Sequence, residues 1–144
     1  MKRQSTTVSV LFLLGTLSLA PALLAHDDGP CSYSSVSGDW GFTSSGTRVG
    51  VGPVAGVGTA TLEKSGNVDG AQTVSFNGII ANETFTGTYT VNSDCTGSLT
   101  VVVSSPIAPR TSHLNLMFVS NSRAVRAIFT DDGTTLTMDG KKLD

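Results

Sequence analysis

The sequence predicts an all-β protein, an eight-stranded antiparallel up-and-down barrel. After the N-terminal region, apolar and polar residues alternate with a period of two in eight segments, as in strands that bury one face. In the same region, no window of eleven or more residues repeats apolar positions with the spacing of a helix. Short connections rich in Gly, Asn, Asp and Ser separate the segments, and such connections favour antiparallel neighbours.

Strands that each carry one apolar face can bury it inside a closed barrel or between the two sheets of a β-sandwich. A closed barrel leaves no exposed edge strand. A regular meander also suits it, because sandwiches usually need a Greek-key crossing. We therefore expect the first strand to pair with both the second and the eighth, and the two-sheet β-sandwich is the alternative.

The alternation gives each strand one inward face. The strands are expected, in chain order, at residues 38–43, 56–64, 68–77, 84–91, 98–104, 113–120, 123–130 and 134–139. The inward residues, strand by strand, are Trp40 and Phe42; Gly58, Ala60 and Leu62; Val74 and Phe76; Phe85, Gly87, Tyr89 and Val91; Leu99, Val101 and Val103; Leu114, Leu116 and Phe118; Val125, Ala127 and Phe129; and Leu136 and Met138.

Turn residues separate these strands. Residues 65–67 and 77–78 contain Gly and Asn, which favour positive φ. One long connection, containing Pro106 and Pro109, links the fifth and sixth strands. Three further connections are residues 92–97, 121–122 and 131–133.

Residues 1–25 have the pattern of a secretory signal peptide. Lys2 and Arg3 form a positive head, an apolar stretch follows, and small residues come where a signal peptidase would cut. The apolar stretch is too short to cross a bilayer core of about 30 Å. Cleavage after Ala22 or Ala25 would release the chain to a periplasm or to the exterior.

The mature chain has the length of a single domain, with residues 26–36 as an N-terminal lead and residues 37–144 as the β-barrel. Loss of the leader changes its formal net charge from −2 to −4, because both leader charges are positive. A weakly acidic chain without basic clusters is a poor candidate for nucleic-acid binding. No second apolar run is long enough for a membrane anchor.

The chain contains two cysteines, Cys31 and Cys95. In an oxidising compartment an even count favours a disulfide, here between the N-terminal lead and the turn after the fourth strand. The alternative is two free thiols. Two cysteines are too few for a structural zinc site, and no Cys-x-x-Cys motif is present for redox chemistry.

Gly38-Asp39-Trp40 opens the first strand and resembles the opening signature of lipocalin-type (calycin) barrels. In that family the Trp closes one end of the barrel, and an Arg from a late strand lies across it. The resemblance therefore implies that Arg123 or Arg126 covers Trp40.

A second resemblance covers most of the mature chain. Residues 87–97 (GTYTVNSDCTG), together with Trp40-Gly41-Phe42 and residues 67–78, are similar to small secreted bacterial proteins of uncharacterised function. This resemblance implies a small secreted barrel and brings no known activity. A looser likeness is to small barrels of the allene oxide cyclase type.

Eight-stranded barrels are either filled by side chains or hold one small ligand. An aromatic residue at an inward position most often belongs to the core. Gly58, Ala60 and Gly87 are small inward residues, however, and they would leave space near the second strand. The predicted pocket is bordered by Leu62, Phe76, Phe85 and Tyr89, with Trp40 closing one end.

Candidate catalytic residues are few. His113 alternates away from the apolar positions of its strand, so we expect it to face solvent. Glu63 and Glu83 lie near strand ends and are expected on the rim, so they are a weak candidate pair for glycoside hydrolysis. No Gly-x-Ser-x-Gly motif is present.

Two places in the sequence carry residue types that can bind metals. Cleavage after Ala25 would make His26 the N-terminus, and its amine and imidazole, with His113, could bind copper. Against this, residues 27–30 have the composition of a flexible tail. Residues 131–133 lack the further oxygen ligands of a calcium loop, so a hairpin turn is expected there. We expect no metal and no cofactor.

The sequence favours a secreted binding protein for a small apolar or amphipathic molecule. One alternative is a non-catalytic extracellular interaction or structural module with a filled core. The other is a cyclase-type barrel enzyme, which the sequence favours less. Binding and cyclisation both require a cavity, whereas the module requires none.

Overall fold

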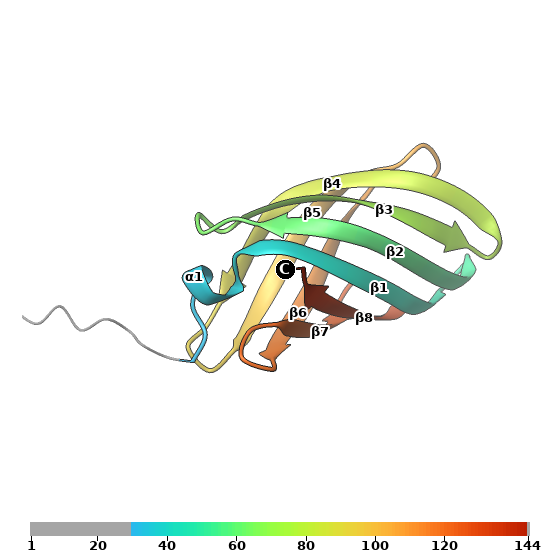
Figure 1. Ribbon diagram of the computed structural model, residues 1–144. Coiled ribbons are helices and arrows are strands. Elements are labelled where there is room, and N and C mark those ends of the chain that lie inside the picture. Colours follow the sequence, from blue (N-terminus) through green and yellow to red (C-terminus); the bar gives the residue numbers. More distant parts are fainter. Residues whose placement is uncertain (1–29, 144) are drawn as a thin grey trace, which may run out of the picture.

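The computed structural model describes residues 30–143 and shows one closed barrel of eight antiparallel strands (Figure 1). Each strand pairs with the next in the chain, and β1 also pairs with β8 to close the sheet. The elements are α1 (Tyr33–Val36), β1 (Gly38–Arg48), β2 (Gly52–Leu62), β3 (Asn67–Phe76), β4 (Ile79–Val91), β5 (Thr96–Ser104), β6 (Arg110–Val119), β7 (Ala124–Phe129) and β8 (Thr134–Lys142). The predicted up-and-down barrel is confirmed, and the sandwich alternative is wrong.

The predicted leader, its cleavage site and His26 lie outside the described residues. Within the described residues, the predicted inward faces of all eight strands are correct, but several strands are longer than expected. β1 extends beyond Thr43 to Arg48. Ser44 and Gly46 take the next inward positions, and because neither has an apolar side chain, the alternation of apolar residues does not reveal this part of the strand. The turn between β3 and β4 is confirmed: Asn77 and Gly78 have φ of 49° and 93°, as a two-residue hairpin requires.

The barrel interior contains two apolar clusters. The larger lies toward the end that carries α1, which we call the α1 end. It includes Trp40, Phe85, Tyr89, Leu116 and Phe118. The smaller lies toward the opposite, far end and consists of Val54, Val74, Phe76, Ala81 and Leu136. Three of the buried polar residues, Ser44, Glu83 and Ser112, lie on inward positions of the strands between these clusters.

The short helix α1 closes one end of the barrel. Ser32 caps the helix and accepts a hydrogen bond from the Ser35 backbone N–H. Val36 is fully buried, and its carbonyl oxygen accepts a hydrogen bond from the Trp40 indole Nε1 at 2.9 Å. Trp40 thus anchors α1 across the α1 end, where Figure 1 shows the helix beside the start of β1.

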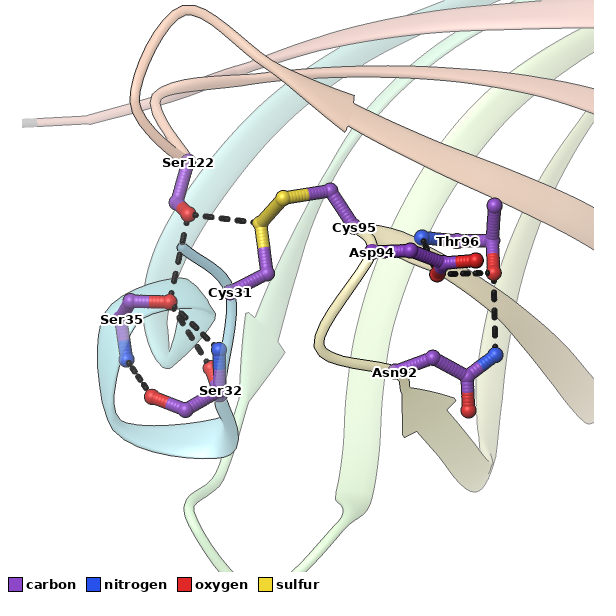
Figure 2. The surroundings of a disulfide bond; sticks show 8 residues. All are labelled: Cys31, Ser32, Ser35, Asn92, Asp94, Cys95, Thr96 and Ser122. Atoms are coloured by element: carbon purple, nitrogen blue, oxygen red, sulfur yellow. Dashed lines mark hydrogen bonds between the residues drawn. A yellow bond between two sulfur atoms is a disulfide. The ribbon is translucent and has the colours of Figure 1, made fainter. Parts of the chain in front are cut away.

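The predicted disulfide is confirmed. Cys31 and Cys95 are bonded, with their Cα atoms 5.0 Å apart, and join the segment before α1 to the β4–β5 turn (Figure 2). Ser122 lies beside this bond, with its Oγ 3.3 Å from Cys31 Sγ and 3.2 Å from Ser35 Oγ. The helix is therefore held to two separate turns of the barrel.

The expectation that Arg126 covers Trp40 is wrong. Arg126 points outward, and its side chain is 76% exposed. Its Nε lies 3.8 Å from Asp139 Oδ1 on the next strand, β8. Arg123 is also exposed, at the end of the β6–β7 turn. Trp40 instead contacts α1 and the ring of Phe118, whose centroid lies 5.9 Å away in an edge-on arrangement.

Candidate functional site

An apolar cavity of about 70 Å³ lies inside the barrel, in the half toward the α1 end. Its wall includes Trp40 and Phe42 of β1, Phe85 of β4, Phe118 of β6 and Met138 of β8, and all eight strands contribute inward residues. A space of this volume holds several water molecules, and it is about half of the ~150 Å³ apolar cavity that binds benzene or xenon. We call it the main cavity.

The structure brings four of the five predicted pocket residues together. Trp40, Leu62, Phe85 and Tyr89 all line the main cavity. Phe76 belongs instead to the cluster at the far end, where it lines a smaller space of about 30 Å³ that we call the far cavity. The rings of Phe42 and Phe85 lie 6.0 Å apart at a tilt of 59°, so aromatic faces form much of one wall of the main cavity.

Two of the three small residues that were expected to leave space, Gly58 and Gly87, do not line the main cavity. A Cβ atom on Gly58 would lie 2.3 Å from the Ala71 carbonyl oxygen, and one on Gly87 would lie 2.0 Å from that of Thr100. Neighbouring backbone therefore fills these positions, as happens where strongly curved strands approach closely. Of the small residues considered, Ala60 does line the main cavity.

A polar layer lies at the inner end of the main cavity. It consists of Gln72 of β3, Glu83 of β4, and Arg110 and Ser112 of β6. Gln72, Arg110 and Ser112 line both the main cavity and the far cavity. The layer therefore lies between the two apolar clusters and contributes residues to the walls of both spaces.

Glu83 is at the centre of this layer. Its carboxylate accepts hydrogen bonds from Arg110 Nη1 at 2.8 Å, Arg110 Nη2 at 2.9 Å and Gln72 Nε2 at 2.7 Å. The Glu83 side chain is 0% exposed and that of Arg110 is 14% exposed. Burial raises the pKa of Glu83, but hydrogen bonds from Arg110, Ser105 and Gln72, with the Arg110 charge, outweigh it and hold this pKa below its ordinary value.

Two further contacts fix the guanidinium of Arg110. Its Nη1 also donates to the Ala108 carbonyl oxygen at 2.8 Å, and its Cζ lies 5.4 Å from the ring centroid of Phe76. Arg110 is opposite Val103 in the register of β5 and β6, close to the end of β5 at Ser104. The side chain reaches Glu83 from there, past the end of the intervening strand.

The expectation that Glu83 lies on the rim is wrong. Glu83 precedes Phe85 by two positions and therefore shares its inward face. The same spacing places Gln72 before Val74 and Ser112 before Leu114. Counting back two residues from each apolar inward residue is the sequence signal that could have identified the layer, although the residues found in this way are polar. Glu63, by contrast, is exposed in the β2–β3 turn.

Tyr89 contributes its ring to the main cavity and directs its hydroxyl elsewhere. The hydroxyl donates to the Glu63 backbone carbonyl oxygen at 2.6 Å, and the ring lies 5.3 Å from that of Tyr33. Burial, followed by the charges of Tyr33 and Glu63, raises the pKa of Tyr89 to about 12. The residue is therefore a neutral wall of the cavity at ordinary pH.

His113 faces solvent, as predicted. Its Nδ1 lies 2.7 Å from Asp131 Oδ1, and its backbone N–H donates to Asp131 Oδ2 at 3.0 Å. Residues 131–133 form the β7–β8 hairpin turn, also as expected, with Gly133 at a φ of 69°. Among residues 30–143, no group of three or more His, Cys, Asp or Glu side chains could hold a metal ion.

Comparison with protein-family models, curated proteins and solved structures finds no match to this chain. Of the resemblances drawn from the sequence, the structure shows the eight-stranded closed barrel itself. Within the described part of the chain, no helix has the length and apolar character needed to span a bilayer.

Proposed function

We propose that this protein is a secreted or periplasmic binding protein that holds one small apolar or amphipathic molecule inside its barrel. The observation that carries the proposal is the main cavity, whose wall is almost wholly apolar and is drawn from every strand. Ligand sites in proteins are typically apolar enclosures with a few polar groups, and the polar layer supplies such groups at one end.

The volume of the main cavity limits the size of the ligand. At about 70 Å³ it suits a molecule with only a few non-hydrogen atoms in the resting structure. Met138 and Leu62 are partly buried wall residues. The flexible Met side chain gives the cavity some capacity to adapt to shape. Large dyes and long-chain lipids exceed this space.

Export to an oxidising compartment is the second part of the proposal. The Cys31–Cys95 disulfide supports it, because such bonds persist in extracellular and periplasmic proteins and are rare in the cytosol. The N-terminal pattern of residues 1–25 gives an independent sequence argument for export.

Titration with pentane and with butanol tests binding, since both are small and largely apolar. The chain has one Trp, so the Trp40 indole N–H gives a single NMR signal from the cavity wall. We expect saturable shifts of this signal with either molecule. Ala60→Leu should weaken binding by filling the cavity, whereas Ala55→Leu, on the exposed face of the same strand, should not.

Absence of saturable shifts with both probes would overturn the proposal. In that case the filled-core interaction module would become the better account. Equal weakening by Ala60→Leu and Ala55→Leu would also count against the cavity as the binding place, because only one of these side chains enters it.

A further inference from the structure

Only some residues of the polar layer line the main cavity. Glu83 has no exposed side-chain surface and lies behind Arg110 and Gln72, which both line the cavity wall. A molecule in the main cavity would therefore lie against Arg110, Gln72 and Ser112, and would be shielded from the Glu83 carboxylate.

The charge of Arg110 is already balanced. Both of its terminal nitrogens donate to the two Glu83 oxygens, in the bidentate arrangement typical of strong Arg–carboxylate pairs. A ligand carboxylate would have to compete with Glu83 for the guanidinium while lying near a second negative charge. A ligand ammonium would meet a positive guanidinium first. Either charged group would lose its hydration without gaining a free partner.

Neutral hydrogen-bonding capacity remains in the layer. A guanidinium has five N–H donors, and the hydrogen bonds to Glu83 and Ala108 use three of them. An ionised carboxylate only accepts, so the Gln72 amide must turn its nitrogen toward Glu83. Its Oε1 therefore points away from the carboxylate, toward the inner face of β2, where it lies 3.6 Å from the position of a Cβ on Gly56.

We propose that the polar layer selects ligands that carry one neutral hydrogen-bonding group, a hydroxyl or a carbonyl, on a small apolar body. The apolar body lies against the aromatic wall near Trp40 and Phe85, and the neutral group meets Arg110 and Gln72. This inference rests on the proposed function, because it assigns the chemical class of the molecule that the main cavity binds.

Four probes of similar size test the inference near neutral pH: butanol, pentane, butanoate and butylamine. Competition experiments followed through the Trp40 indole signal rank them. We expect butanol to bind more tightly than pentane, and more tightly than either charged probe by about tenfold or more. Butanoate binding as tightly as butanol would overturn the inference, as would pentane matching butanol.

A variant of Glu83 separates a role in ligand selection from a purely structural role of the ion pair. Only a role in selection predicts that the ranking of the probes changes. Glu83→Gln removes the charge that neutralises Arg110, so butanoate should gain about tenfold relative to butanol. Glu63→Gln is the matched control, because it makes the same change on an exposed turn, and it should leave the ranking of probes unchanged.

The outcomes separate the inference from the proposed function. If no probe binds to the native protein, the binding function itself fails. If all probes bind without regard to their polar group, the cavity binds ligands and the selective role of the layer fails. Should Glu83→Gln not fold, the ranking on the native protein still decides the inference.

Discussion

Glu83 and Arg110 form a bidentate ion pair inside the barrel, with Nη1 to Oε1 at 2.8 Å and Nη2 to Oε2 at 2.9 Å. The pair lies between two apolar clusters and beside the cavity that we propose binds a ligand. Removing buried charges from water is unfavourable, and the hydrogen bonds from Gln72 and to Ala108 help to offset that cost.

The ion pair makes a prediction about stability. Glu83→Gln should lower the free energy of unfolding by about 3 kcal/mol, because Arg110 keeps its charge in a low-dielectric interior. The double variant Glu83→Leu/Arg110→Met should be less destabilised than this single variant, since no charge is left unpaired. Urea unfolding followed by Trp40 fluorescence measures both. A double variant less stable than the single one would contradict this account of the pair.

The same pair predicts an acid sensitivity. The pKa of Glu83 is lower in the folded protein than in the unfolded chain, so its stabilisation is present above the unfolded pKa. It is lost as pH falls below about 4 and passes through the folded pKa. Unfolding free energies measured from neutral to acid pH should fall less steeply for Glu83→Gln than for the native protein. Identical slopes would show that Glu83 is not linked to acid unfolding.

The disulfide should contribute substantially to stability. Cys31 and Cys95 are separated by 64 residues, and the loop-entropy estimate for such a closure is about 4 kcal/mol. Reduction should lower the urea midpoint accordingly, and Cys31→Ser/Cys95→Ser should match the reduced protein. Reductant should have no effect on that double variant. An unchanged midpoint in native protein whose thiols have both been freed would refute the prediction.

Tyr89 should make the protein sensitive to alkali. Its pKa is raised to about 12, whereas the unfolded chain ionises near the ordinary tyrosine value of about 10. The stabilisation is therefore complete below that value and is lost as pH rises toward 12. Tyr89→Phe should lose about 1 kcal/mol at neutral pH through the missing hydrogen bond to Glu63, and should show a flatter alkaline decline. Equal alkaline slopes in urea titrations would contradict this role.

The sequence was sufficient to predict the barrel because its inward positions are mostly unambiguous. Leu114, Leu116 and Phe118 alternate with polar residues on β6, and the same pattern recurs around the sheet. Turn residues then fix the order of antiparallel neighbours, as the Asn77-Gly78 hairpin illustrates. The disulfide followed from the expected compartment and the even count of cysteines.

The polar layer could not be predicted in the same way. The inward face of a strand is recognised in a sequence by its apolar residues. Glu83 shares a face with Phe85, but its charged side chain gives no indication that it is buried. Its burial depends on Arg110, which lies two strands away and reaches it past the end of β5. That proximity arises from the stagger of the closed barrel, which no single strand encodes. The role of Trp40 was predicted in part: it lies at one end of the barrel, but its indole donates a hydrogen bond to α1, and Arg126 points outward.

A crystal structure with 2-bromoethanol, which carries its bromine at the end opposite the hydroxyl, tests the central claim most directly. The anomalous signal of bromine locates the apolar end of the molecule. We predict bromine in the main cavity beside Trp40 and Phe85, with the hydroxyl within hydrogen-bond distance of Arg110 or Gln72. Bromine found only on the outer surface of the barrel, with the interior closed around empty or water-filled space at saturating probe, would contradict the account.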